Sequence, residues 1–428
     1  MDFTPSVYPV ICGFLLCFLT LGLYFKYTSQ AIDYWIFLGT IPSLLWNSDR
    51  VFEWMTEVFC SLGRGSFYMD GPMFSNYRFL EIFDAVGVGI FNVDSDTWRL
   101  QRKLAHAGLI LGEFKAQLVP FLAYVAEEGF NIDLKDVFSR YVYDINMGMV
   151  FGRYENYLYI GLPSNEMAEI TNTAQRALLF MNVVPLFVWK LQRLFRIVET
   201  ADLLSIYIKA LADNSSNFAS LAGKDNYLKD EMLNLFLAVR DTVKSALTWF
   251  FWLVSTTPYV EAKILEELYS LVSLTRRTHK WPWVFRSDDL KGLVYLHAAL
   301  SESLRLYPPL PINRKFVVKK DVLPDGSVVT PGMEILLSFY SVGRMPWVWG
   351  EDCLEFKPER WITENGKLID PTSRFVPDAA FTQMKSVVAP MLFNFHVEVV
   401  KGHHVCPQQG TTLYMKNGLQ VNIKKRTA

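Results

Sequence analysis

The stretch Glu302-Ser-Leu-Arg305-Leu-Tyr-Pro-Pro309 joins a helical segment to two consecutive prolines, and further along the chain reads Phe356-Lys-Pro-Glu-Arg360-Trp361. Glu302 and Arg305 lie three residues apart, so they share one face of the predicted helix and can pair. A bare Glu-x-x-Arg is usually a surface ion pair of little energy. Its meaning therefore depends on the residues around it.

Helical patterns dominate those surroundings. The longest runs from Asp230 to Thr257 and ends at Pro258, and another runs from Leu290 to Leu306. Because Arg240, Asp241 and Lys244 lie in the middle of the longer segment, and charge is costly in lipid, we expect a core helix rather than a membrane span. Short strands are expected at 316–318, 328–329 and 334–339, and Asn417-Gly418 between 412–415 and 419–423 predicts a hairpin. The predicted class is mainly α with a small β region.

Composition sets limits on the protein class. The chain has 428 residues, 51% of them hydrophobic, so it needs a large buried core, a membrane segment or both. A formal net charge of -1 gives no reason to expect nucleic acid as a partner. The five cysteines are an odd number without paired spacing, which argues against a disulfide framework. They are Cys12, Cys17, Cys60, Cys353 and Cys406.

The N-terminus carries an uncharged apolar run from Val7 to Phe25, close to the length that a spanning helix needs. A cleaved signal peptide is the alternative. Against it, Asp2 and no basic residue precede the run, and Lys26 follows it. We expect an uncleaved anchor over residues 1–26, with residues 27–428 as one domain on the cytosolic side of the membrane.

With Leu304, Tyr307 and the prolines around them, Glu302, Arg305 and Arg360 resemble the Glu-x-x-Arg helix and the Pro-Glu-Arg meander of cytochromes P450. The resemblance implies that these three residues form a buried structural triad, to which the bidentate pairing of guanidinium and carboxylate is suited. It further implies a P450-like fold, a haem (iron protoporphyrin) cofactor, and electrons from NADPH through NADPH-cytochrome P450 reductase at the endoplasmic reticulum membrane.

Three further residues are expected to contact the haem by the same resemblance. Trp98 and Arg102 match the family's Trp-x-x-x-Arg helix, whose indole and guanidinium bind a haem propionate. Their spacing of four places both on one helix face. Arg314 lies where such proteins often place another propionate contact.

The long helix contains Leu237-Ala-Val239-Arg-Asp241-Thr242, which resembles the family's oxygen-activation motif. In that motif an acid and an alcohol relay protons, so Asp241 and Thr242 are the candidate catalytic residues. Val239 stands where the family has glycine. A β-branched side chain there is expected to crowd the groove that glycine leaves open.

The family's cysteine loop has no counterpart here. A P450 needs a cysteine thiolate on the haem iron, but this chain reads Ser373-Arg-Phe-Val-Pro377-Asp-Ala-Ala, and 381–388 then resembles the helix that follows the loop. A second gap is expected after Gly71-Pro-Met-Phe-Ser-Asn76. The fold is therefore expected to be incomplete. We assign no metal site to His403, His404 and Cys406, because adjacent ligands on a strand edge rarely form one.

The tracts 81–96, 246–252 and 347–352 most resemble the plant fatty-acid and alkane hydroxylases. This implies a haem-thiolate monooxygenase that hydroxylates long-chain fatty acids or alkanes. One alternative is an inactive P450-like membrane protein that lacks haem-thiolate ligation. Another is an incomplete gene product that lacks two internal segments.

Overall fold

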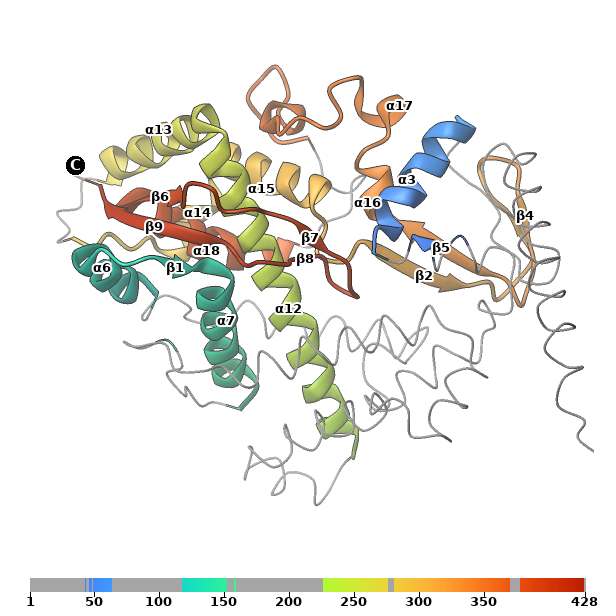
Figure 1. The fold of residues 1–428 in the computed structure, drawn as a ribbon, viewed down its shortest axis with the longest axis horizontal. Coiled ribbons are helices and arrows are strands. Elements are labelled where there is room, and N and C mark those ends of the chain that lie inside the picture. Colours follow the sequence, from blue (N-terminus) through green and yellow to red (C-terminus); the bar gives the residue numbers. More distant parts are fainter. Residues whose placement is uncertain are drawn as a thin grey trace, which may run out of the picture.

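The computed structural model of the chain describes residues 43, 46–47, 49–63, 118–151, 158, 226–275, 281–369 and 378–426. The expected anchor over residues 1–26 and the second gap after Asn76 lie outside these residues. Most of the described chain is helical (Figure 1). The helices are α3 (Val51–Leu62), α6 (Leu118–Glu128), α7 (Leu134–Phe151), α12 (Asn226–Thr256), α13 (Pro258–Thr275), α14 (Ser287–Lys291), α15 (Val294–Leu306), α16 (Phe339–Val342), α17 (Pro346–Trp349), the 3-10 helix Pro358–Trp361 and α18 (Asp378–Asn394).

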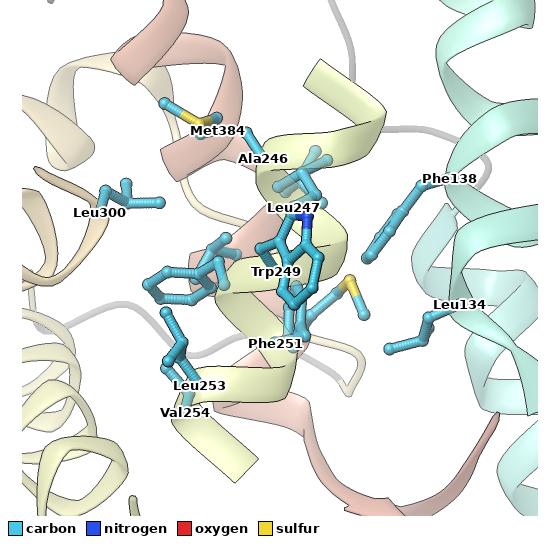
Figure 2. Close-up of a cluster of buried hydrophobic side chains, with 14 of the residues drawn as sticks. Leu134, Phe138, Ala246, Leu247, Trp249, Phe251, Leu253, Val254, Leu300 and Met384 are labelled. Carbon is cyan, nitrogen blue, oxygen red and sulfur yellow. The ribbon is translucent and has the colours of Figure 1, made fainter. Parts of the chain in front are cut away.

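Helix α12 is the central element of the core. Its segment 246–254 is apolar apart from Thr248, and the helix lies beside α7 (Figure 1). Figure 2 shows Leu247 and Trp249 of α12 among Phe138 of α7, Leu300 of α15 and Met384 of α18. All of these side chains are buried, and burial of such large side chains stabilises each by roughly 1.5–3 kcal/mol. The expected long core helix from 230 to 257 is confirmed.

The described strands form four small antiparallel sheets. The largest has the order β1-β9-β6, and the others pair β2 with β5, β3 with β4 and β7 with β8. The expected class, mainly α with a small β region, is confirmed. The strands are β1 (Ile132–Asp133), β2 (Ile312–Phe316), β3 (Asp321–Val322), β4 (Val328–Val329), β5 (Glu334–Ser338), β6 (Phe395–Val399), β7 (Pro407–Gln408), β8 (Tyr414–Met415) and β9 (Gln420–Lys425).

The expected hairpin around Asn417-Gly418 is wrong in its pairing. Gly418 does form a turn, with φ of 69° and its N–H donating to the carbonyl of Met415. However, β8 before the turn pairs with β7, and β9 after it pairs with β6 and β1. The alternate side chains Val421 and Ile423 are buried, and this burial favours a place for β9 in the larger sheet.

Two smaller expectations also differ from the structure. The segment from 290 to 306 is not one helix, because α14 ends before Gly292 and α15 begins at Val294. The strand expected at 316–318 instead spans β2, Ile312–Phe316, in register with β5. No described helix is long and apolar enough to cross a membrane.

Candidate cofactor and catalytic site

Glu302 lies at the centre of a buried hydrogen-bond network. Its side chain is fully buried, and Arg305 of the same helix donates to both of its oxygens, Nε to Oε2 and Nη2 to Oε1, each at 2.8 Å. Arg360 Nε donates to Oε1 at 3.2 Å, and Trp361 Nε1 donates to Oε2 at 2.8 Å. The structure therefore brings together the three residues of the expected triad and adds Trp361.

The two arginines of the triad also fix the chain between them. Arg305 Nη1 donates to the carbonyl of Cys353 at 2.6 Å and to that of Gly343. Arg360 Nη1 donates to the carbonyl of Trp349 at 2.7 Å. Charge-assisted hydrogen bonds to main-chain carbonyls fix the position of this segment, which includes the short helix α17. The triad thus joins α15 to the loop that runs from α16 to the 3-10 helix.

Asp352 extends this network toward solvent. Its carboxylate accepts hydrogen bonds from Lys357 Nζ at 2.9 Å and pairs with Arg360 Nη2 at 2.7 Å. The hydrogen bonds from Lys357 and Arg360 lower the pKa of Asp352 to about 2. Asp352 was not identified from the sequence, where it reads as one acid among several near the meander.

The candidate catalytic residue Asp241 lies in a buried ion pair. Lys244 Nζ donates to Asp241 Oδ1 at 2.8 Å, and both side chains are about as buried as the core. Burial lowers the pKa of Lys244, and the neighbouring Asp241 carboxylate opposes that shift. Thr242 is half-buried, unlike Asp241 next to it. The acid of the expected acid–alcohol pair is thus already bound by a cation of its own helix.

On the same side of α12, polar residues tie the helix to the segment that precedes β8. Ser245 Oγ donates to the carbonyl of Leu413 at 2.5 Å, and Trp249 Nε1 donates to the same oxygen at 3.0 Å. The ammonium of Lys244 lies 4.9 Å from the centre of the Tyr414 ring. These contacts pack this part of α12 against Leu413 and Tyr414. The sequence offers no signal for them, because the shared acceptor is a main-chain carbonyl.

The expected propionate contacts are not brought together by the described residues. Trp98 and Arg102 lie outside them. Arg314 is described, and its guanidinium lies 3.4 Å from Glu334 on the neighbouring strand β5. Burial raises the pKa of Glu334, and Arg314 opposes this shift. Arg314 retains the donor groups that a propionate requires, and here it pairs with a carboxylate of its own sheet.

Helix α18 is fixed in place by contacts that the sequence did not reveal. Lys385 Nζ donates to the carbonyls of Leu290 and Leu293, at 3.2 and 2.9 Å, and burial lowers the pKa of Lys385 to about 8. The ring of His297 on α15 stacks on Phe381, with 3.8 Å between centroids. The sequence signal for these contacts is a lysine inside the apolar run of α18, because a buried ammonium needs hydrogen-bond acceptors.

The thiol groups of the described chain do not fit a haem-thiolate centre. Cys353 is buried at the triad, Cys60 is exposed on α3, and Cys406 lies beside β7. Burial, and then the nearby Cys353, raises the pKa of Cys60, whereas a metal-binding thiol needs a lowered pKa. Residues 370–377, which precede α18, contain no cysteine. The donor that iron would need in this family is therefore not where α18 could present it.

The His403, His404 and Cys406 segment is occupied by local hydrogen bonds. His403 Nε2 lies 3.0 Å from the carbonyl of Gly418, and Cys406 Sγ lies 3.5 Å from that of Pro407. Among the described residues, no group of three or more histidine, cysteine or acidic side chains is arranged to hold a metal ion.

Comparisons with known proteins extend the likeness to nearly the whole chain. The model of the cytochrome P450 family matches residues 62–423. Alkane hydroxylase MAH1 of Arabidopsis thaliana is 33% identical over 477 residues, with 92% of this chain and 93% of the relative covered. Cytochrome P450 86B1 of the same plant is 31% identical, with 93% and 86% covered. A noroxomaritidine synthase of Narcissus aff. pseudonarcissus is 32% identical over 497 residues, with 98% and 97% covered.

These aligned lengths of 477 and 497 residues exceed the 428 residues of the chain. The relatives therefore contain internal residues that have no counterpart here. Among solved structures, a cytochrome P450 (CYP102L1) shares the fold with a TM-score of 0.64 at 16% identity, covering 89% of this chain and 99% of its own. From the Glu302 triad, the fold and the family match, the chain is a member of the cytochrome P450 family.

Proposed function

We propose that this chain has the architecture of a monooxygenase that hydroxylates long-chain fatty acids or alkanes. The observation that carries the proposal is its identity of 33% with an alkane hydroxylase over 92% of the chain. Cytochrome P450 86B1, at 31% identity, supports the P450 family, and its name states no substrate. A relative of similar identity is named noroxomaritidine synthase, so the proposal rests on the tracts 81–96, 246–252 and 347–352 as well as on identity.

The proposed partners follow from the reaction. A P450 monooxygenase takes its electrons from a redox partner, and we assign that role to NADPH-cytochrome P450 reductase. The apolar run from Val7 to Phe25 supports a single N-terminal anchor in the endoplasmic reticulum membrane, with the catalytic domain in the cytosol. A membrane location also suits a substrate that dissolves in lipid.

Haem supplies the oxygen chemistry of this family, and its thiolate ligand promotes O–O cleavage. The described thiols do not fit that role, so the proposed reaction requires a ligand that the described residues do not supply. The chain's own residues contribute the frame: the Glu302 triad holds the loop after α16, and Lys385 holds α18.

A second candidate is favoured by the cysteine-free segment before α18. It is a P450-like membrane protein without haem-thiolate chemistry, which acts through binding rather than oxidation. The buried Asp241–Lys244 pair also favours it, because a carboxylate bound by an ammonium is less free to pass protons.

The experiment expresses the full chain in microsomes with the reductase and supplies NADPH with fatty acids and alkanes of several chain lengths. Hydroxylated products that depend on NADPH support the first candidate. Absence of products from a preparation with a normal thiolate-type carbon-monoxide spectrum would show that the substrate class is wrong. Absence of both products and spectrum would favour the second candidate.

A further inference from the structure

We propose that this chain, as its sequence stands, does not bind haem through a thiolate, and that its frame still accepts a cysteine-bearing loop before Asp378. We call the inserted segment the ligand loop. The inference rests on the proposed function only in that the proposed reaction requires haem. It concerns the position in the chain at which the cysteine ligand is missing and the helices that remain around that position.

The first half of the proposal, that haem is not bound through a thiolate, follows from the positions of the sulfur atoms. Cys353 is buried in the loop that follows α17, and its carbonyl accepts a hydrogen bond from Arg305. Moving its thiol to α18 would break the triad. Cys60 lies on α3, far upstream of α18, and Cys406 lies beside β7, which follows α18, so neither thiol is in the segment that leads into α18. The described chain therefore has no cysteine that the family's arrangement could place on an iron.

The second half follows from the supports of α18, which do not depend on the ligand loop. Near its N-terminal end, Phe381 stacks on His297 and Lys385 binds two carbonyls. At its C-terminal end, Asn394 exchanges hydrogen bonds with the main chain of Trp283, donating at 2.8 Å and accepting at 2.7 Å. Both ends of α18 are thus held by residues at 283–297.

Helix α15, which supplies His297, is itself fixed by the triad through Glu302 and Arg305. Figure 1 shows α15 and α18 close to each other beside α12, and all three helices are in contact. The elements that flank the ligand site in this family are therefore in place. The aligned relatives are longer than this chain internally, which is consistent with the loss of a segment rather than a rearrangement of the helices.

The test compares three full-length proteins produced with a haem precursor. The first is the chain as written. The second carries, between Pro377 and Asp378, a loop of the family's haem-ligating type with one cysteine. The third carries the same loop with serine in place of that cysteine. Haem per chain and the reduced carbon-monoxide difference spectrum are measured for each, with circular dichroism as a check of folding.

The inference expects a thiolate-type Soret band from the cysteine-loop protein alone, with haem approaching one per chain. The chain as written and the serine-loop protein should lack that band. A thiolate-type band from the chain as written overturns the first half. A cysteine-loop protein that lacks the band, or that loses its helical circular dichroism, overturns the second half.

These outcomes are separate from those that test the proposed substrate. If the cysteine-loop protein shows the band but oxidises neither fatty acids nor alkanes, the proposed function fails and this inference stands. If the chain as written shows the band and hydroxylates an alkane, this inference fails and the proposed function stands.

Discussion

At the scale of single residues, Glu302 shows how one buried charge is satisfied. Both of its oxygens accept hydrogen bonds from Arg305, and Arg360, Trp361 and the backbone N–H of Lys357 also donate to them. Burial of a carboxylate is costly unless it is paired and hydrogen-bonded. Glu302 is therefore buried with its charge satisfied by partners on its own helix and on the segment at 357–361.

Glu302→Gln should lower the free energy of unfolding by about 3 kcal/mol, because it leaves the buried Arg305 and the partly buried Arg360 without their shared anion. Chemical denaturation measures the change. Glu364→Gln, at an exposed position in the following turn, is the matched control and should change stability by less than about 0.5 kcal/mol. Equal effects of the two substitutions would contradict a central role for Glu302.

The Asp241–Lys244 pair makes a second prediction at this scale. Lys244→Met removes the cation and leaves a buried carboxylate, so it should destabilise by about 3–5 kcal/mol. Asp241→Asn combined with Lys244→Met removes both charges and should recover much of that loss. A thermodynamic cycle of unfolding free energies measures the coupling. Additive effects would show that the two side chains do not depend on each other.

At the scale of secondary-structure elements, local patterns predicted helices better than strand pairing. The apolar run and Pro258 were sufficient to predict α12, and Val328–Val329 is the strand β4. Asn417-Gly418 predicted a turn and a turn exists, but the flanking strands pair elsewhere. The pairing of β9 depends on contacts with β6 and with β1, which lies far upstream at Ile132–Asp133, and no local pattern contains them.

The turn at Gly418 can be tested directly. Gly418 has a positive φ, and a Cβ placed there would collide with the carboxylate of Asp133. Gly418→Ala should therefore destabilise by more than Gly402→Ala, whose φ is also positive but whose Cβ would meet open space. The backbone cost common to both is about 1–2 kcal/mol. Equal melting temperatures for the two variants would show that Asp133 is not in contact.

Contact between α15 and α18 gives a pH prediction. Burial, with a smaller contribution from Lys385, lowers the pKa of His297 from 6.5 to about 4. Between these values the unfolded chain binds a proton that the folded chain does not, so this contribution to stability is complete above pH 6.5 and falls as the pH approaches 4. His297→Gln should reduce the loss of stability over that window. If the free energy of unfolding changes between pH 7 and pH 4 by the same amount in His297→Gln as in the unchanged chain, this prediction is wrong.

At the scale of the whole molecule, the family and its structural triad could be predicted from the sequence, whereas the environment of the candidate site could not. Glu302, Arg305 and Arg360 are recognisable because charged residues at fixed spacings flank prolines and a tryptophan. The pairing of Asp241 with Lys244 could not be predicted, because spacing alone does not show which residues pack against that side of α12. Lys385 and His297 act through a helix contact that depends on the complete fold.

The helices that support the site are retained, whereas the iron ligand expected before α18 is not. The fold retains α12, α15 and α18 in contact, yet the segment before α18 has no thiol.

A smaller side chain on α12 cannot replace a missing iron ligand, so Val239→Gly alone should leave haem binding unchanged. A rise in thiolate-ligated haem in that variant would show that crowding, rather than the absent cysteine, limits binding.

The central claim is that this cytochrome P450 chain keeps its supporting frame without its thiolate ligand. Its most direct test is the reduced carbon-monoxide difference spectrum of the purified full-length chain. We predict that no thiolate-type Soret band is present, while circular dichroism shows a folded helical protein. A thiolate-type band in that spectrum would contradict the account.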